Sequence, residues 1–380
     1  MDRLTADWLE SPGAREVTGL LTAAGHRALF VGGCVRNALL GLAPGDLDLA
    51  TDAEPAEVMA LAKTAGVKAI PTGIEHGTVT LVAHGEALEV TTFRADVETD
   101  GRHAVVRFSR DVAEDAARRD FTMNALYAAP DGALLDPLGG LPDLRAGRVR
   151  FIGAPEARIA EDGLRILRFF RFTAWYGAPE EGIDAEGLAA CAAAGEALEG
   201  LSRERIGHEM VRLLEAPDPA PAVASMQAAG LLARVLPGAS AAALAPLVHA
   251  EGTLGLAPDT ARRLAALGGE SPQENLRLSN ALAARAARLA EAVGTVQTPA
   301  ELGYRLGAEE GASVLALLGA PVEALAPLRR GAEAVFPVSA ANLRPDYEGA
   351  ALGARLRALE AEWLAGGMTA TREELLGSKG

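Results

Sequence analysis

The chain changes character near Pro155, and this change limits the folds that it can adopt. Before that point strand and helix signals alternate. The stretches RALFVGG and GTVTLVAHGEALEVTTF are rich in β-branched and apolar residues, and a His-Gly turn inside the second predicts a hairpin. Helices are expected around 35–40 and 55–65. After Pro155, stretches such as RERIGHEMVRLLEA and ALAARAARLAEAVG carry only helical periodicity. The pattern predicts an α+β chain: a small head with a mixed or antiparallel sheet and helices, then an all-α remainder.

Composition narrows the class of protein. A chain of 380 residues fits two or three domains, and 49% hydrophobic residues allow a well-buried core. No apolar run reaches about 18 residues, and the acidic start MDRLTADWLESPG lacks a hydrophobic signal core. We therefore expect no membrane span and a cytoplasmic location. Cys34 and Cys191 form no CxxC pair, which argues against a zinc site and a disulfide framework.

The balance of charge restricts how the chain could meet a nucleic acid. A net charge of −15 argues against a broad basic surface, but it does not exclude a local basic groove. Lysine occurs only at positions 63, 68 and 379, so nearly all the positive charge is arginine. Arginine suits bidentate recognition of phosphates and bases. Nucleic-acid binding would then depend on a local arginine groove.

A pair of carboxylates follows the first predicted helix. Asp46 and Asp48 lie at i and i+2, so on a strand both side chains point to one face and can reach one metal site. Glu89 alternates with Leu88 and Val90, and it would supply a third carboxylate if the two strands are neighbours. Three acidic groups around two Mg²⁺ ions suit in-line nucleotidyl transfer. The alternative is a polar turn before a helix, which a bare DxD motif often is.

A glycine pair precedes the same helix, in FVGGCVRNALLG. Gly32 and Gly33 would let backbone N–H groups approach a phosphate, and Arg36 in the first turn could reach the same anion. A tight packing turn explains a lone Gly-Gly equally well. Together, however, the glycine turn, the helix and the DxD strand form a triphosphate pocket that faces a metal site.

These residues carry a family resemblance. VGGCVRNALLGLAPGDLDLAT is similar to the opening motif of class II CCA-adding enzymes and bacterial poly(A) polymerases, which belong to the nucleotidyltransferase superfamily. The chain departs from that motif at Asn37, where the family usually has aspartate. We expect this position to be structural rather than metal-binding.

The stretch RRDFTMNAL resembles the second motif of the family. Arg118 and Arg119 suit phosphates, while Asp120 and Asn124 suit ribose hydroxyls. The resemblance implies that this segment selects ribonucleotides. The alternative is a helix start in which Asp120 or Thr122 caps the backbone.

The stretch EDGLRILR resembles the family's base-reading motif, in which the matching Asp162 and Arg165 form a protein template for the incoming base. Their spacing of three predicts that they share one helix face, where an ordinary surface ion pair is the alternative. Cytosine and adenine present an amine beside an acceptor nitrogen, which a carboxylate and a guanidinium match. Guanine and uracil present the reverse pattern. Arg168 would contact phosphate or brace the helix.

Three further stretches resemble other motifs of the family, and all the matches together stand in the family's order along the chain. DPLGGLPDLRAG resembles its hinge, where Gly139, Gly140 and Asp143 would let the pocket change size. The segment from Arg94 that contains Gly101, Arg102 and His103 resembles its flexible loop. RERIGHEMVRLL resembles its fifth motif, in which Arg205 would stabilise the neck.

The resemblance implies a complete enzyme. Residues 1–150 would form the nucleotidyltransferase head, 151–214 a helical neck that recognises the base, and 215–380 a helical body and tail that bind tRNA. Mg²⁺ at the carboxylates would activate the tRNA 3′-hydroxyl for attack on the α-phosphate of CTP or ATP, and pyrophosphate would leave. The partners would be the tRNA acceptor arm and these two nucleotides, with no membrane and no evident protein partner.

Other functions stay open at this point. Enzymes that add only A and poly(A) polymerases belong to the same family, although this chain lacks a basic GRRF-like stretch and a basic C-terminal extension. A non-catalytic RNA-binding protein on the same scaffold would not need the three carboxylates. A small-molecule nucleotidyltransferase would not need EDGLRILR or so long a helical part.

Overall fold

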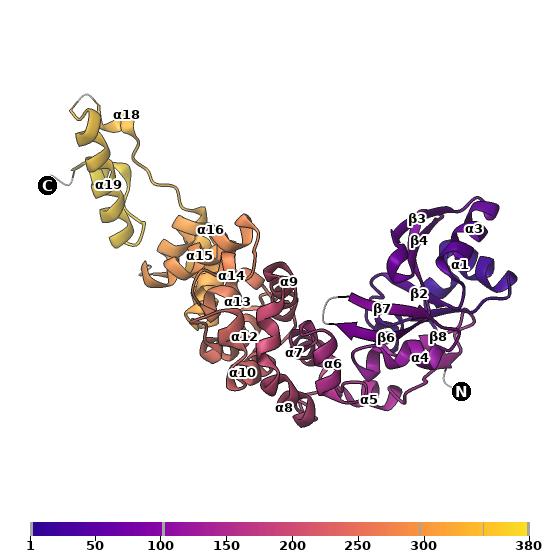
Figure 1. Ribbon diagram of the computed structural model, residues 1–380. Coiled ribbons are helices and arrows are strands. Elements are labelled where there is room, and N and C mark those ends of the chain that lie inside the picture. The colour runs from indigo at the N-terminus through magenta and orange to yellow at the C-terminus, as the bar shows by residue number, and fades with distance from the viewer. Residues whose placement is uncertain (1–2, 101–102, 296–297, 345, 378–380) are drawn as a thin grey trace. The chain divides into compact units, whose positions relative to one another are not determined.

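The computed structural model describes residues 3–100, 103–295, 298–344 and 346–377, which form two compact units (Figure 1). The first unit comprises residues up to 213 together with 225–235, and it contains all the strands. The second comprises 214–224 and the residues from 236 onward, and it is helical. The expected division into a head of residues 1–150 and a neck of residues 151–214 stays a prediction, because the boundary between them lies inside the first unit.

The first unit is built on a mixed sheet of seven strands in the order β3-β4-β5-β2-β1-β8-β9. All neighbours are antiparallel except β2 and β5, which run parallel. The strands are β1 (Ala28–Val31), β2 (Leu47–Thr51), β3 (Lys68–Gly73), β4 (Thr78–Ala83), β5 (Glu86–Thr92), β8 (Tyr127–Ala128) and β9 (Leu134–Leu135). The predicted hairpin is confirmed: β4 and β5 are joined at His84 and Gly85, which both have positive φ as a two-residue hairpin turn requires.

Helices α2 (Gly33–Leu39) and α3 (Pro55–Ala65) lie where the sequence predicted them, and helix α1 (Pro12–Ala23), which the sequence analysis did not predict, covers the sheet as well. Helices α1 and α3 pack against each other and against β4 and β5, so they share one face of the sheet (Figure 1). Helix α2 joins β1 to β2. The sheet is therefore buried on the α1–α3 side, and the loops that follow β1 and precede β2 are left to build a site.

The segment predicted as a flexible loop contains a second sheet. Strands β6 (Arg94–Asp100) and β7 (His103–Phe108) form an antiparallel pair, and helix α4 (Val112–Ala117) follows. Gly101 and Arg102 lie outside the described residues.

Five further helices follow α4 in the first unit. They are α5 (Leu141–Ala146), α6 (Pro155–Glu161), α7 (Leu164–Tyr176), α8 (Ala185–Ala193) and α9 (Arg203–Leu214). Phe121, which follows α4, packs with its ring 4.9 Å from those of Phe151 and Phe172 and 6.3 Å from that of Phe169. Because the last two rings belong to α7, this aromatic cluster fixes α7 beside the segment that carries RRDFTMNAL.

Of the remaining helices, residues 225–235 belong to the first unit and the others to the second. These helices are α10 (Ala220–Ala228), α11 (Leu232–Val235), α12 (Leu244–Leu254), α13 (Thr260–Leu267), α14 (Pro272–Asn275), α15 (Asn280–Thr295), α16 (Pro299–Leu317), α17 (Leu325–Glu333), α18 (Ala340–Leu343), α19 (Gly349–Ala365) and α20 (Arg372–Gly377). On α13, Arg263 is fully buried and pairs with the buried Glu251 of α12 at 2.8 Å. Around Trp363 of α19, a separate apolar cluster includes Leu343 and Leu375. Among the described residues, no helix combines the length and the apolar character needed to cross a membrane.

The stretch predicted as a hinge packs tightly against the site segment. Gly140 precedes α5, and a Cβ atom there would overlap the carbonyl oxygen of Thr122. Asp143, which is buried, accepts hydrogen bonds from Thr122 Oγ1 at 2.7 Å and from Arg150 Nε at 3.0 Å. Thr122 thus anchors α5 and does not cap a helix with its side chain.

We expect Gly140→Ala to lower the free energy of unfolding by about 1–3 kcal/mol, because the added methyl group must displace backbone. Chemical denaturation of the full chain measures this change. Gly19→Ala is the matched control, since Gly19 is exposed in α1 with open space around it, and it should be neutral or stabilising. Equal stability of the Gly140→Ala variant and the unmodified protein would show that the contact with Thr122 is loose.

Candidate active site

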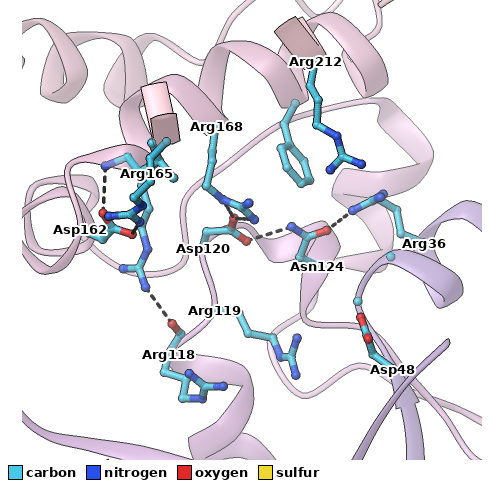
Figure 2. Close-up of a pocket in the computed structure, with 15 residues that line it drawn as sticks. Arg36, Asp48, Arg118, Arg119, Asp120, Asn124, Asp162, Arg165, Arg168 and Arg212 are labelled. Atoms are coloured by element: carbon cyan, nitrogen blue, oxygen red, sulfur yellow. Dashed lines mark hydrogen bonds and ion pairs between the residues drawn. The ribbon is translucent and has the colours of Figure 1, made fainter. Parts of the chain in front are cut away.

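A cleft of about 530 Å³ in the first unit gathers most of the predicted site residues (Figure 2). Twelve of the fourteen residues singled out from the sequence line it, together with three that were not. The lining residues are Gly32, Gly33, Arg36, Asp48, Arg118, Arg119, Asp120, Asn124, Asp162, Leu164, Arg165, Arg168, Phe172, Arg205 and Arg212. Seven arginines face three aspartates, so the cleft is strongly basic although the chain carries a net charge of −15.

The glycine pair forms the turn between β1 and α2. Gly32 has φ 73° and ψ −122°, a conformation that essentially only glycine adopts. Arg119 lies beside this turn, with its Nη1 3.5 Å from where a Cβ of Gly32 would be, which is an ordinary contact distance. The turn therefore exposes backbone to the cleft beside a guanidinium.

Arg36 is a buried cation whose hydrogen-bond partners, among the residues that the structure describes, are neutral. Its side chain hydrogen-bonds Asn124, donates to the Tyr176 hydroxyl at 2.8 Å, and lies over the Tyr176 ring with 4.1 Å between the guanidinium carbon and the ring centroid. Burial lowers the pKa of this guanidinium. Because isolated buried charges are costly, this arrangement favours an anion in the cleft.

Asn37 explains the departure from the family motif. Its Oδ1 accepts hydrogen bonds from Arg36 Nη2 at 2.9 Å and Nε at 3.2 Å, and its Nδ2 donates to the Ala43 carbonyl at 2.8 Å. The residue ties α2 to the loop that leads to Asp46 and Asp48. This role is structural, as expected from the sequence.

The three predicted carboxylates lie on neighbouring strands. Asp48 on β2 pairs in register with Glu89 on the parallel strand β5, and the exposed Asp46 precedes β2. Burial raises the pKa of Asp48 to about 6, and the charges of Glu89 and Asp46 add to this rise. Asp46 and Glu89 do not line the cleft itself. Among the described residues, no set of three or more acidic, histidine or cysteine side chains is already gathered closely enough to hold an ion.

Arg118 and Arg119 are oriented by a carboxylate that the sequence analysis missed. Asp115, almost fully buried on α4, accepts hydrogen bonds from Arg118 Nε at 3.1 Å, Arg119 Nη2 at 3.0 Å and the Tyr127 hydroxyl at 2.7 Å. Burial alone would raise the pKa of Asp115, but the two arginines outweigh it and lower the pKa to about 2. The spacing of three and four residues to the arginines was the available signal.

Asp120 is the centre of a buried polar network. Its Oδ1 accepts from the Phe121 amide at 2.8 Å and from Asn124 Nδ2 at 2.9 Å, and its Oδ2 accepts from Arg168 Nε at 2.7 Å. Burial opposes ionisation, yet Arg168 leads the interactions that hold the pKa of Asp120 below its ordinary value. Since Asn124 also contacts Arg36, the network runs from α2 through Asn124 and Asp120 to α7.

A second buried carboxylate extends this network, and it was also missed. Glu209 on α9 accepts from Arg171 Nε at 2.6 Å and lies 3.8 Å from Arg168 Nη1. Its position four residues after Arg205 on α9 did not indicate this role, because its partners Arg171 and Arg168 are on α7. Glu209 thus connects α9 to the two arginines of α7.

The predicted geometry of the base-reading pair needs correction. Asp162 is not on a helix with Arg165: it lies at the junction between α6 and α7 with extended backbone, φ −153° and ψ 107°. Asp162 and Arg165, both of which the structure describes, do not form the surface ion pair that was the alternative. Asp162 accepts from the Leu164 amide at 3.0 Å and pairs with Arg205 at 2.7 Å, whereas Arg165 pairs with Glu161.

Each member of the pair keeps bonding capacity toward the cleft (Figure 2). Each Asp162 oxygen accepts one protein hydrogen bond, so a further lone pair is available on both. Arg165 also donates to the carbonyl oxygens of Arg158 at 2.9 Å and Arg118 at 3.2 Å, which fixes its orientation. Arg205 pairs with Asp162 from α9, and its expected role in stabilising the neck stays a prediction.

Known families match two parts of the chain. Residues 28–150 match the poly A polymerase head domain, and residues 182–243 match a probable RNA and SrmB-binding site of polymerase A.

Curated relatives are similar over about half of the chain. It is 42% identical over 207 residues to human mitochondrial CCA tRNA nucleotidyltransferase 1, which covers 54% of this chain and 48% of that protein. It is 43% identical over 200 residues to a CCA-adding enzyme of Lacticaseibacillus paracasei, covering 52% of this chain and 48% of that enzyme. The chain thus spans about half the length of these relatives.

Solved structures resemble nearly the whole chain. A Thermotoga maritima CCA-adding enzyme complexed with tRNA has the same fold, with a TM-score of 0.69 and 19% identity over 95% of this chain and 92% of that one. A Bacillus stearothermophilus CCA-adding enzyme in complex with CTP gives a TM-score of 0.73 and 31% identity, covering 93% of this chain and 92% of that one. With that identity over almost the full length, the protein belongs to the family of CCA-adding enzymes and poly(A) polymerases.

Proposed function

We propose that the protein adds C, C and A to the 3′ end of tRNA, using CTP and ATP and releasing pyrophosphate without a nucleic-acid template. The observation that carries this proposal is the basic cleft, in which the buried Arg36 has only neutral protein partners. The relatives solved with CTP, ATP and tRNA support this choice of substrates.

The triphosphate would be held at the glycine turn. Gly32 and Gly33 leave the backbone accessible there, and Arg36 and Arg119 present guanidinium groups on its two sides. Asp115 keeps Arg118 and Arg119 extended, so their orientation is fixed before a nucleotide arrives. This preorganisation lets the cleft stabilise charge that develops on the phosphates during transfer.

Membership of a nucleotidyltransferase family implies dependence on a divalent metal ion. The donors fit such an ion, because hard cations prefer carboxylate oxygens. A cation would also relieve the repulsion from Glu89 and Asp46, which adds to the effect of burial in raising the pKa of Asp48. We propose Mg²⁺. Held by Asp46 and Asp48 with assistance from Glu89, it would supply positive charge to the attacking 3′-oxygen and to the leaving pyrophosphate.

Asn124 and Asp120 would read the ribose. Asn124 keeps one N–H and one lone pair beyond its bonds to Asp120 and Arg36. Each Asp120 oxygen already accepts two hydrogen bonds, so its contact with a ribose hydroxyl requires Arg168 to release Oδ2. Arg168 would then be available to a phosphate.

Asp162 and Arg165 would read the base. The ionised Asp162, held by Arg205, would accept from the exocyclic amine of cytosine or adenine, while Arg165 would donate to the adjacent ring nitrogen. Guanine and uracil would place a carbonyl against the carboxylate and an N–H against the guanidinium.

Transfer of radiolabelled nucleotides to tRNA that lacks its 3′ end tests the function directly. We expect CTP alone to add two residues, ATP alone to add almost none, and the mixture to add three. Use of ATP alone, without CTP, would instead assign the protein to A addition or polyadenylation. If no nucleotide is added to a tRNA that another CCA-adding enzyme extends, nucleotidyl transfer by this protein is rejected.

Asp48→Asn should reduce the rate of nucleotidyl transfer roughly a hundredfold or more. The variant removes a carboxylate that would hold the metal ion, and the ion would stabilise the transition state by several kcal/mol. The same variant should raise the thermal midpoint in EDTA at pH 7.5. The pKa of folded Asp48 is raised to about 6, so ionised Asp48 destabilises the metal-free protein above that pH, and the penalty disappears as pH falls through 6 toward the unfolded value.

The gain in stability should accordingly shrink between pH 7.5 and pH 4 when thermal unfolding is followed in EDTA. Asp52→Asn is the control for a nearby aspartate outside the cleft. An Asp48→Asn variant that retains transfer would remove Asp48 from the metal site, whatever its stability.

Asp162→Asn should shift nucleotide choice toward UTP, since an amide can donate to the carbonyl that uracil presents in place of the cytosine amine. We expect the preference for CTP over UTP to fall at least tenfold, because one reversed hydrogen bond is worth about 1–3 kcal/mol. Competition between the two nucleotides on tRNA measures it. Glu161→Gln is the control, because it removes one negative charge from the neighbouring residue. If it lowers the preference for CTP over UTP as much as Asp162→Asn does, the change in net charge explains the shift and hydrogen bonding to the base does not.

A further inference from the structure

Arg212 lines the active-site cleft without a partner for its charge. It lies in the last turn of α9 and is exposed, and Figure 2 shows its side chain reaching into the cleft from that helix. The other six arginines of the cleft bond carboxylates, amides, a hydroxyl or carbonyl oxygens of the protein. Within the described part of the chain, the guanidinium of Arg212 makes no hydrogen bond or ion pair.

Trp175 stands beside Arg212. Its Nε1–H donates to the Arg212 carbonyl oxygen at 2.7 Å, yet 38% of the residue is exposed. Arg165, Arg168 and Phe172 on α7 line the cleft at helical spacing, and Trp175 is three residues further along the same helix. The indole thus continues the cleft-lining face of α7 outward, fixed in place by α9.

We propose that Trp175 and Arg212 form the binding surface for the single-stranded 3′ end of the RNA that is to be extended. Arg212 binds a phosphate of the RNA backbone, and the exposed indole stacks on an adjacent base. This inference rests on the proposed function, because it requires an RNA substrate in the cleft.

The chemistry of the two side chains favours this occupant. Proteins that hold single strands combine aromatic faces for the bases with cations for the backbone. A free nucleotide triphosphate presents the same phosphate oxyanions, but Arg36, Arg119 and the glycine turn already surround the place proposed for it. An RNA end must instead enter from solvent, where Trp175 and Arg212 are exposed.

The repulsion among neighbouring arginines supports the same assignment. The charge of Arg212 contributes to lowering the pKa of Arg171, after burial as the main cause, and Glu209 is already engaged by Arg171 and Arg168. A phosphate at Arg212 would supply the missing negative charge. Contacts of this kind position a nucleic acid without reading its sequence.

The test compares five variants in the full chain: W175A, W175F, R212A, R212K and R203A. Arg203 is the matched control, because it is exposed on the same helix and does not line the cleft. Binding is measured by fluorescence anisotropy of an RNA acceptor-stem minihelix with a single-stranded 3′ end in CC, without nucleotide. KM values for this RNA and for ATP are measured separately, and thermal unfolding verifies the fold of each variant.

We expect R212A and W175A to weaken minihelix binding roughly tenfold, the size that base stacking and a phosphate contact give elsewhere. R212A should also reduce the slope of log K against log salt by about 0.7. The KM for ATP should stay unchanged. R203A should match the unmodified protein, and R212K and W175F should recover most of the binding.

Three results would overturn the inference. A rise in KM for ATP alone would place a nucleotide phosphate, not RNA, at Arg212. Equal losses in W175F and W175A would show that the indole N–H braces α9 and that stacking is not involved. If all variants bind the minihelix like the unmodified protein while it still extends tRNA, only this inference fails. If the unmodified protein extends no RNA, the proposed function itself fails.

Discussion

The ion pair between Arg168 and Asp120 holds the active site together, because it joins α7 to the segment that follows α4. Asp120 is buried and Arg168 is partly buried, so loss of Arg168 would leave an uncompensated buried carboxylate. The packing of Phe121 against Phe172 lies next to this pair and fixes the same two segments through apolar contact. Asn124 connects Asp120 to Arg36, so a nucleotide that binds at one end of this network would change the strength of the hydrogen bonds at the other end.

An acidic protein can thus present a basic site because six of the seven arginines of the cleft are held by defined protein partners. Asp115 fixes Arg118 and Arg119, and carbonyl oxygens fix Arg165. Guanidinium groups that are oriented in advance lose little conformational entropy when an anion binds. The net charge of the whole chain is therefore a poor guide to what the cleft binds, since the local field depends on placement.

The sequence predicted the parts of the site that local patterns encode. The His-Gly hairpin and the strand-glycine-helix turn follow from periodicity and turn residues, and the order of motifs indicated the family. The pairing of β2 with β5 was only a condition in the sequence analysis, because local patterns do not specify which strands are neighbours. The sequence did not predict Glu209, whose partners lie on another helix, because a carboxylate in a helical stretch looks the same whether it is buried or solvated. The spacing of Asp162 and Arg165 was misleading for a related reason. Helical periodicity cannot locate a one-residue break such as the extended backbone at Asp162.

Asn37 illustrates how one atom can adjust such a site. An aspartate there would accept the same two hydrogen bonds from Arg36, but it would neutralise the guanidinium and could not donate to the Ala43 carbonyl. Asparagine keeps the geometry, adds a tie to the loop before Asp46, and leaves the charge of Arg36 without an acidic partner. The buried guanidinium then gains more from an incoming anion, because no carboxylate competes for it. The substitution should therefore strengthen the attraction of the cleft for a triphosphate and leave the carboxylates of Asp46 and Asp48 untouched.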